Sequence, residues 1–173
     1  MVITSSNNLV GTAGEYFVCA ELCRRGFLAL LTPKNNPLFD VIASTQDGSK
    51  TVSIQVKTRS IQNKQGWKLG KDITDKKNDS GLFVVLVNLE EEGLPEFYIY
   101  EYDALADVVG KNYSAYLEKP KRDGSKRKDV GFRWHDTNLF SDDDHSRKNN
   151  WQPIEEQLCQ PRHSVERKKQ GAH

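Results

Sequence analysis

The alternation of apolar and polar residues predicts a β-hairpin in residues 39–60, with a turn at residues 46–49. Both arms are rich in β-branched residues, and Gly48 in the turn can adopt a positive φ at little cost. Successive side chains of a strand point to opposite faces of a sheet. In the second arm, Gln55 and Lys57 therefore share one face, and the isoleucine and valine that alternate with them share the other.

The remaining patterned segments predict a mixed sheet with flanking helices. The near-continuous apolar run at residues 82–89 is typical of a central strand that is buried on both faces. Helices and strands together favour an α/β (α+β) fold in which helices cover a mixed central β-sheet. In chain order the expected elements are a helix at 10–25 that Gly26 ends, a strand at 27–31, the two hairpin strands, strands at 82–89 and 97–102, and a helix at 104–109 that Asp103 caps and Gly110 ends.

The chain of 173 residues is long enough for one domain with a substantial core, which we place at residues 1–160. Residues 119–128 hold six basic side chains in ten positions, and they fit either a phosphate-binding loop or an ordinary solvated loop. A C-terminal helix is expected at 153–159, with Pro153 at its first position. The basic segment at 161–173 is expected to be a disordered tail.

Composition and charge indicate the compartment of the protein more than they indicate its activity. The formal net charge of +1 does not by itself indicate a nucleic-acid-binding protein, although a local basic rim would be enough. Cys19 and Cys23 lie one helical turn apart, which is a poor geometry for a disulfide, and no further ligand indicates a zinc site. We expect buried free thiols in a reducing cytoplasm. The sequence shows neither a signal peptide nor a membrane span.

The hairpin also carries a candidate hydrolytic site. Asp40 opens its first strand, and Gln55 and Lys57 follow on the second. Cleavage of a phosphodiester needs a metal ion that neutralises phosphate charge and activates water, and a cation that stabilises the developing charge. Mg²⁺ prefers oxygen ligands, which Asp40 and Gln55 can supply, while Lys57 can hold water or offset phosphate charge. The alternative is a turn aspartate followed by an ordinary half-exposed strand.

Glu15 is a second candidate acid. At about 100° per residue, it falls on the apolar stripe of the predicted helix, together with Val18, Cys19 and Leu22. A carboxylate on an apolar face is rarely buried unless it is paired. Glu15 is therefore either part of a site or an acid in the first turn that complements the helix dipole.

Taken in order, these residues resemble the PD-(D/E)xK nuclease superfamily, which has the restriction-endonuclease-like fold. The resemblance rests on Glu15 in the first helix, Asp40 at the start of a strand and the Gln-x-Lys pair on the next strand, and it spans residues 9–109. The framing segments are similar to those of small resolvase-like members and of bacterial intron homing endonucleases. Two positions differ from the family pattern, because Phe rather than Pro directly precedes Asp40 and a Gln replaces the usual acid.

The resemblance implies a Mg²⁺-dependent DNA endonuclease, with Mn²⁺ as a substitute ion and no small-molecule cofactor. Asp40, Gln55 and Glu15 would hold or orient the metal ion, and Lys57 would stabilise the attacking hydroxide. The resemblance also implies a homodimer or larger homo-oligomer that acts on duplex or branched DNA. The expected contacts to nucleic acid are the basic residues Lys34, Arg59, Lys68, Lys121, Arg122, Lys126, Arg127 and Lys128.

Two other interpretations stay open at this point. Because Gln55 removes a formal charge from the site, the domain can be a catalytically inactive nucleic-acid-binding module on the same fold. The two candidate acids and the lysine can instead form a buried ion network. Outside the site, we interpret Trp67 as covering the edge of the core rather than stacking on a base, and His135 as a structural residue.

Overall fold

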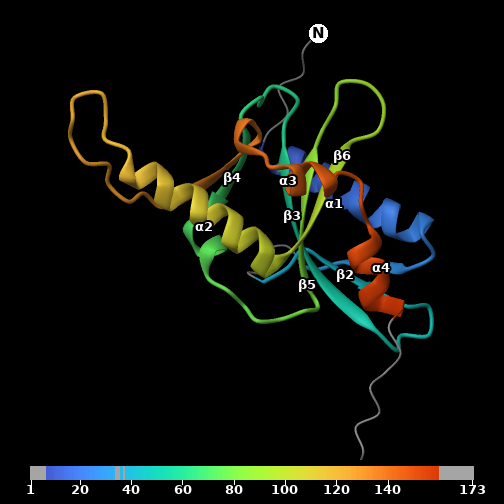
Figure 1. The fold of residues 1–173 in the computed structure, drawn as a ribbon. Coiled ribbons are helices and arrows are strands. Elements are labelled where there is room, and N and C mark those ends of the chain that lie inside the picture. The colour runs from blue at the N-terminus through green and yellow to red at the C-terminus, as the bar shows by residue number, and fades with distance from the viewer. Residues whose placement is uncertain (1–6, 34–35, 37, 160–173) are drawn as a thin grey trace, which may run out of the picture.

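The computed structural model describes residues 7–33, 36 and 38–159. Its main sheet has five strands in the order β1-β2-β3-β5-β6 (Figure 1). Neighbouring strands are antiparallel except for β3 and β5, which run parallel, so the sheet is mixed as expected. The strands are β1 Leu28–Leu31, β2 Val41–Ser44, β3 Thr51–Arg59, β5 Leu82–Asn88 and β6 Glu96–Glu101.

A second sheet pairs two strands that are far apart in the chain. Strand β4 (Gly66–Gly70) runs antiparallel to β7 (Phe132–Asp136). Four α-helices and two 3-10 helices complete the described part of the chain. They are α1 Asn7–Arg24, η1 Lys71–Thr74, α2 Tyr102–Glu118, η2 Thr137–Leu139, α3 Asp142–Ser146 and α4 Gln152–Cys159.

Strand β5 divides the hydrophobic core into two halves. Its side chains Phe83, Val85 and Val87 pack on one face with residues of α1 and α4. Val84 and Leu86 pack on the other face with residues of β4 and α2. All five side chains are at most 1% exposed. The predicted central strand, buried on both faces, is therefore confirmed, and the helices on the two faces confirm the expected fold class.

Strands β2 and β3 form the hairpin expected in residues 39–60. Val41 pairs with Ile54, and Gly48 in the turn has a φ of +68°. Ile54 lies in the half of the core that contains α1. Because side chains alternate along β3, Gln55 and Lys57 face the other side, toward β4 and η1.

Helix α2 is longer than the sequence pattern indicated. It continues through Gly110 for about two further turns, so the expected end at that residue is wrong. A glycine inside a helix costs only about 1 kcal/mol relative to alanine, and the apolar stripe before it anchors the helix to the core. The expected cap is also wrong. Glu101 is the N-cap, and Asp103 lies in the first turn, where its carboxylate accepts hydrogen bonds from the amides of Lys77 and Asn78.

The three cysteines form no disulfide, which confirms the expectation of free thiols. Cys19 is partly buried, and burial raises the pKa of its thiol to about 11. Cys23 and Cys159 are exposed, so the expectation of burial is wrong for these two. Across the residues that the structure describes, no helix combines the length and apolar character needed to cross a bilayer. The basic segment at 161–173 lies outside those residues.

Candidate active site

Asp40 is held by the backbone of β3, immediately before β2 begins. Its amide donates to the carbonyl oxygen of Ile54 (2.9 Å), and its carboxylate oxygen Oδ2 accepts a hydrogen bond from the amide of Val56 (2.7 Å). Val41 pairs with Ile54, so the register places Asp40 opposite Gln55. Opposite residues of an antiparallel pair share a face of the sheet. The structure therefore brings Asp40 beside Gln55, as the sequence predicted.

Gln55 and Lys57 line a common cavity of about 240 Å³ between β3 and the segment around η1. Asp72, in η1, adds a carboxylate to the same cavity. This acid was not among the predicted site residues, because nothing in the sequence distinguishes it from other acids in a polar segment. The rest of the lining is formed by Leu69, Gly70 and Ile73.

Lys57 also lines a second cavity, of about 280 Å³, and more basic side chains line this cavity than the first one. Lys57, Arg59 and Lys68 are its basic residues. Three positive side chains around one hollow complement an anion such as a phosphate group. The remaining lining residues are Val10, Thr58, Ser60, Asn63, Gly66 and Trp67.

The guanidinium group of Arg59 is partly engaged within the protein. Its Nε donates to Oδ1 of Asn88 (2.6 Å), and the group lies 4.6 Å from the centre of the Trp67 ring. Burial lowers the pKa of Arg59, and its Nη1 has no hydrogen-bond partner among the described residues. Trp67 is itself 2% exposed and donates to the carbonyl of Val87, which confirms its place in the core. The contact of Arg59 with nucleic acid stays a prediction.

Glu15 lies on α1, which covers the face of the sheet opposite to Gln55 and Lys57. Its neighbour Gly14 is buried, and a Cβ atom at this glycine would overlap the hydroxyl group of Thr58. The backbone of α1 therefore passes directly against β3, one residue beyond Lys57. Glu15 is partly buried at this crossing, and its part in the site stays a prediction.

The oxygen atoms around Asp40 suit a hard divalent cation. Within the described residues, neither Oδ1 of Asp40 nor the side-chain amide of Gln55 has a hydrogen-bond partner. Mg²⁺ and Mn²⁺ are held through oxygen ligands and retain several waters, so a carboxylate and an amide oxygen are sufficient protein ligands. The same part of the chain contains no cluster of three or more His, Cys, Asp or Glu side chains that could hold a metal ion.

The buried ion network is disfavoured by the exposure of the site. Asp40 and Lys57 are both partly exposed, and no ion pair joins them in the part of the chain that the structure describes. A lysine side chain beside an open cavity can interact with a ligand rather than with a fixed protein partner. The arrangement is therefore a site that can receive an anion together with a cation.

His135 belongs to a separate, buried hydrogen-bond network. Its Nε2 lies 3.0 Å from the hydroxyl oxygen of Tyr100, which donates to Oδ1 of Asp144 (2.8 Å). Oδ2 of Asp144 accepts hydrogen bonds from the amide and the hydroxyl of Ser141. His135 and Asp144 are each 1% exposed, so no substrate can reach them. This confirms His135 as a structural residue.

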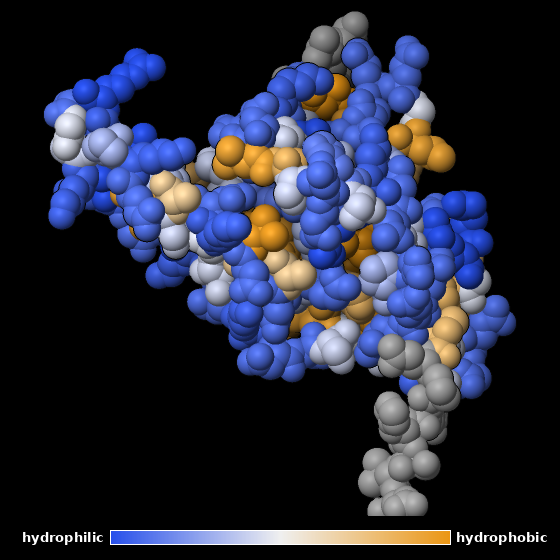
Figure 2. Space-filling model, in the orientation of Figure 1, coloured by the Kyte–Doolittle hydropathy of each residue, from blue (hydrophilic) through white to orange (hydrophobic). Residues whose placement is uncertain are grey.

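The other expected contacts to nucleic acid lie mainly in the loop that follows α2. This loop, at residues 119–128, projects away from the body of the protein (Figure 1), and its visible surface is hydrophilic (Figure 2). Lys34 lies outside the described residues. Of the basic loop residues expected to contact nucleic acid, Arg127 is partly buried. The other four are exposed, namely Lys121, Arg122, Lys126 and Lys128.

Solved structures with a similar fold include a homing endonuclease and a Holliday junction resolvase. The bacterial homing endonuclease I-Ssp6803I is 17% identical with a TM-score of 0.48, and the match covers 87% of this chain and 93% of that one. The Holliday junction resolvase Hjc of Archaeoglobus fulgidus is 16% identical with a TM-score of 0.42, covering 75% of this chain and 86% of that one. These are the two kinds of protein that the sequence resemblance named. No family model and no curated protein matches the chain.

Proposed function

We propose that this protein is a metal-dependent DNA endonuclease that hydrolyses phosphodiester bonds at Asp40, Gln55 and Lys57, with Glu15 as a further acid of the site. The observation that carries the proposal is the pairing of Asp40 with Gln55 across β2 and β3, with Lys57 next on the same face. Gln55 and Lys57 bring an amide oxygen and an amine to one cavity, and the strand register places the carboxylate of Asp40 beside Gln55. These are the groups that phosphodiester hydrolysis requires.

Asp40 and Gln55 are the residues that would hold a Mg²⁺ or Mn²⁺ ion, and Asp72 lines the same cavity. When bound, the ion supplies neutralisation of phosphate charge and a more acidic water. Oδ2 of Asp40 is fixed by the Val56 amide, so Oδ1 is the carboxylate oxygen left to face a ligand. Anchoring by the backbone of β3 keeps this acid in place without help from another side chain.

Lys57 acts between the two cavities that it lines. On the side of Gln55, its amine can hold a water molecule in position for attack on phosphorus. On the other side, together with Arg59 and Lys68, it stabilises the negative charge that develops on the phosphate oxygens. The three basic residues also bind the DNA backbone without regard to sequence.

We also propose that the active assembly is a homodimer, because cutting both strands of a duplex needs two sites. The edge strand β1 supports a second copy as the partner. Its leucines Leu28, Leu30 and Leu31 are 49%, 63% and 37% exposed, and an apolar edge strand is a ready surface for pairing. Sedimentation equilibrium of the native chain and of Leu30→Lys tests this. We expect a dimer that the substitution dissociates.

The nuclease proposal is tested by cleavage of supercoiled and four-way branched DNA in Mg²⁺ or Mn²⁺. Lys57→Ala and Asp40→Asn should each lower the rate at least about a hundredfold, the cost of removing one group that stabilises the transition state. Lys50→Ala is the matched control, since this lysine lies at the far end of the same hairpin. Cleavage that survives Lys57→Ala contradicts the assignment.

The inactive binding module remains the second candidate because Gln55 lowers the charge of the metal site. Calorimetric titration with Mn²⁺ separates the two functions. A nuclease binds Mn²⁺ in the native chain and loses it in Asp40→Asn, whereas Lys57→Ala retains it. DNA binding without either cleavage or Mn²⁺ binding supports the inactive module.

A further inference from the structure

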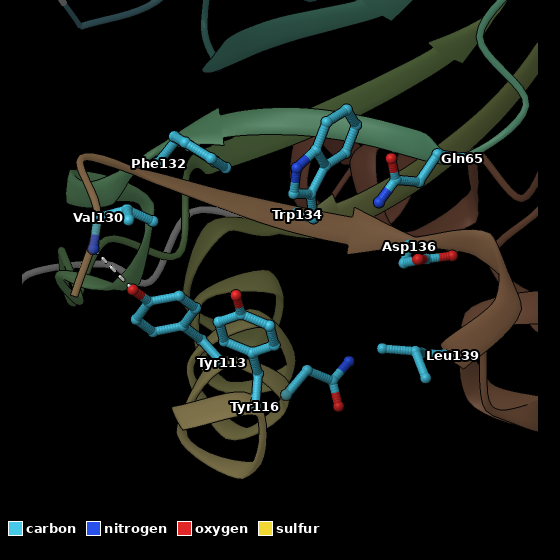
Figure 3. Close-up of a pocket in the computed structure, with 9 residues that line it drawn as sticks. Gln65, Tyr113, Tyr116, Val130, Phe132, Trp134, Asp136 and Leu139 are labelled. Atoms are coloured by element: carbon cyan, nitrogen blue, oxygen red, sulfur yellow. Dashed lines mark hydrogen bonds between the residues drawn. The ribbon is translucent and has the colours of Figure 1, made fainter. Parts of the chain in front are cut away.

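A third cavity, lined by aromatic rings, lies between α2 and strand β7. The cavity measures about 400 Å³, and four aromatic residues form its walls, namely Tyr113, Tyr116, Phe132 and Trp134. Figure 3 shows the two tyrosines of α2 facing β7, with Val130 at one end and Leu139 at the other. The polar members of the lining are Gln65, Asn112 and Asp136.

The aromatic side chains line this cavity without filling it. Residues of β7 alternate, so that Arg133 and His135 are buried while Phe132, Trp134 and Asp136 face outward. Trp134 is partly exposed, in contrast to the other two tryptophans of the chain, which are each 2% exposed. An exposed group of large aromatic rings around a hollow marks a binding surface rather than a piece of core.

Positive charge surrounds the aromatic rings. The guanidinium group of Arg127 lies 4.3 Å from the centre of the Tyr116 ring, and the ammonium group of Lys68 lies 4.3 Å from that of Phe132. Arg127 belongs to the basic loop at residues 119–128. Flat apolar surfaces beside cations suit a ligand that combines a planar ring with a phosphate.

The segment around β4 connects this cavity to the proposed active site. Lys68 lines the basic cavity of Lys57, and across the second sheet it pairs with Trp134. Gln65 lines the aromatic cavity, while the next residue, Gly66, lines the basic one. One strand of nucleic acid can therefore pass from Lys57 along Lys68 to the aromatic rings.

We propose that this aromatic cavity binds an unstacked base of the DNA strand that is held at Lys57. The proposal rests on the nuclease function proposed above and adds a preference for DNA with unpaired bases. The volume lies in the range of small-ligand pockets and suits a base rather than a duplex. Trp134 and Tyr116 provide stacking surfaces, as aromatic side chains do in proteins that bind single strands.

The polar lining supports a base as the occupant rather than a purely apolar ligand. Within the described residues, the side-chain amides of Gln65 and Asn112 have no hydrogen-bond partners. Asp136 uses only Oδ1, which accepts from Asn138, so Oδ2 is left to accept a further bond. Amides and a carboxylate can together satisfy the donors and acceptors on the edge of a base.

The test measures binding of a fluorescein-labelled oligodeoxythymidylate of about 12 nucleotides by fluorescence anisotropy, in EDTA so that no cleavage occurs. Trp134→Ala should weaken single-strand binding by about five- to a hundredfold, the range for loss of one stacked base. Tyr116→Ala should weaken single-strand binding as well. Because Tyr116 is 45% exposed, this second variant should fold even if Trp134→Ala does not. Trp134→Phe is the matched control and should retain binding to within about threefold, since it keeps a ring for stacking.

A blunt duplex of equal length separates base stacking from phosphate binding, and its affinity should not change in these variants. Single-strand affinity that is equal in the native chain, Trp134→Ala and Tyr116→Ala overturns the proposal. So does an equal loss of single-strand and duplex affinity, which would assign the rings a general structural role.

Cleavage assays on the native chain and on Lys57→Ala, set beside the binding of the aromatic variants, distinguish the two proposals. If Lys57→Ala abolishes cleavage while the aromatic variants bind single strands normally, the base site fails and the nuclease stands. If single-strand binding depends on Trp134 but the native chain cuts no DNA with Mg²⁺ or Mn²⁺, the nuclease fails and the base site stands. If the native chain neither binds single strands nor cuts DNA with Mg²⁺ or Mn²⁺, both proposals fail.

Discussion

Asp40 and Val56 are joined by a hydrogen bond of 2.7 Å, in which the amide of Val56 donates to the carboxylate of Asp40. The same residue that supplies the proposed metal ligand thus also satisfies a backbone donor of the neighbouring strand. A change at Asp40 therefore affects stability and metal binding by separate routes, which the choice of substitution can distinguish.

Asp40→Asn should preserve the fold, because the amide oxygen of asparagine can still accept from Val56. Asp40→Ala leaves that donor without a partner in a part-buried position, and we expect it to lower the free energy of unfolding by about 1–3 kcal/mol. Both variants should lose Mn²⁺ binding. Urea unfolding at neutral pH measures the first effect and calorimetry the second. An alanine variant as stable as the native chain would show that water replaces the carboxylate.

Gln55→Glu should strengthen Mn²⁺ binding by about tenfold, because the number of charged ligands is a main determinant of affinity for hard cations. Ser53→Glu is the matched control, since it adds the same charge two residues earlier on the same face of β3 and should leave the affinity unchanged. Calorimetric titration compares the two. Equal gains in both variants would show a general charge effect and would remove Gln55 from the ligand set.

The hairpin and the central strand were predictable because their signals are local. The alternation around Gln55 and Lys57 identifies the two faces of β3, and the unbroken apolar run of β5 reports burial on both sides. Asp40, Gln55 and Lys57 come together because a tight turn connects their strands, so closeness in sequence becomes closeness in space.

The second sheet was not predictable by the same reasoning. Strand β4 is short and begins and ends with glycine, and its partner β7 follows more than sixty residues later. Neither strand carries a pattern strong enough to stand alone, and pairing between distant segments leaves no local signal. The cavity with Asp72 and the aromatic cavity both depend on this sheet, and they were therefore missed with it.

Gly14→Ala should destabilise the protein by about 1–3 kcal/mol, the usual cost of overpacking. A methyl group at this position overlaps the hydroxyl of Thr58 and lies 3.0 Å from both its Cβ and its Cγ2. No rotation of Thr58 clears all three atoms, so the helix must move away from β3. Gly11→Ala, on the same helix, meets no atom within 4 Å and should stabilise it by about 0.5–1 kcal/mol.

Chemical denaturation of the two variants tests this difference. If both alanines stabilise the protein, α1 does not pass against β3 at Gly14. If Gly14→Ala also lowers DNA cleavage while Gly11→Ala does not, the result supports the placement of Glu15 near the site, because Gly14 is its direct neighbour.

His135 should make the protein lose stability in mild acid. The single hydroxyl proton of Tyr100 is donated to Asp144, so Nε2 of His135 must carry the proton that it donates to the tyrosine oxygen. Its other nitrogen, Nδ1, is buried without a hydrogen-bond partner among the described residues. Protonation would create a buried positive charge with an unsatisfied donor, and burial accordingly lowers the pKa of His135 to about 4.

The direction of the pH effect follows from this lowered pKa. In the unfolded chain the imidazole titrates near its ordinary pKa of about 6.5, so the unfolded state binds a proton first as the pH falls. The free energy of unfolding should therefore decrease between about pH 6.5 and pH 4, by up to about 3 kcal/mol in total. Asp144 affects the free energy of unfolding at a lower pH than His135 does. Although burial opposes it, hydrogen bonds from Ser141 and Tyr100 hold its pKa below the usual range, so its contribution is lost only below about pH 4.

Urea unfolding at intervals between pH 7.5 and pH 4.5, for the native chain and for His135→Gln, measures the contribution of His135. Glutamine cannot take up the proton, and its amide can still donate to Tyr100. We expect the native chain to lose stability steadily across this interval and the variant to lose less, so that the two curves converge toward acid pH. Parallel curves would show that His135 does not carry the effect, and that its buried nitrogen accepts a proton as readily in the folded state as in the unfolded one.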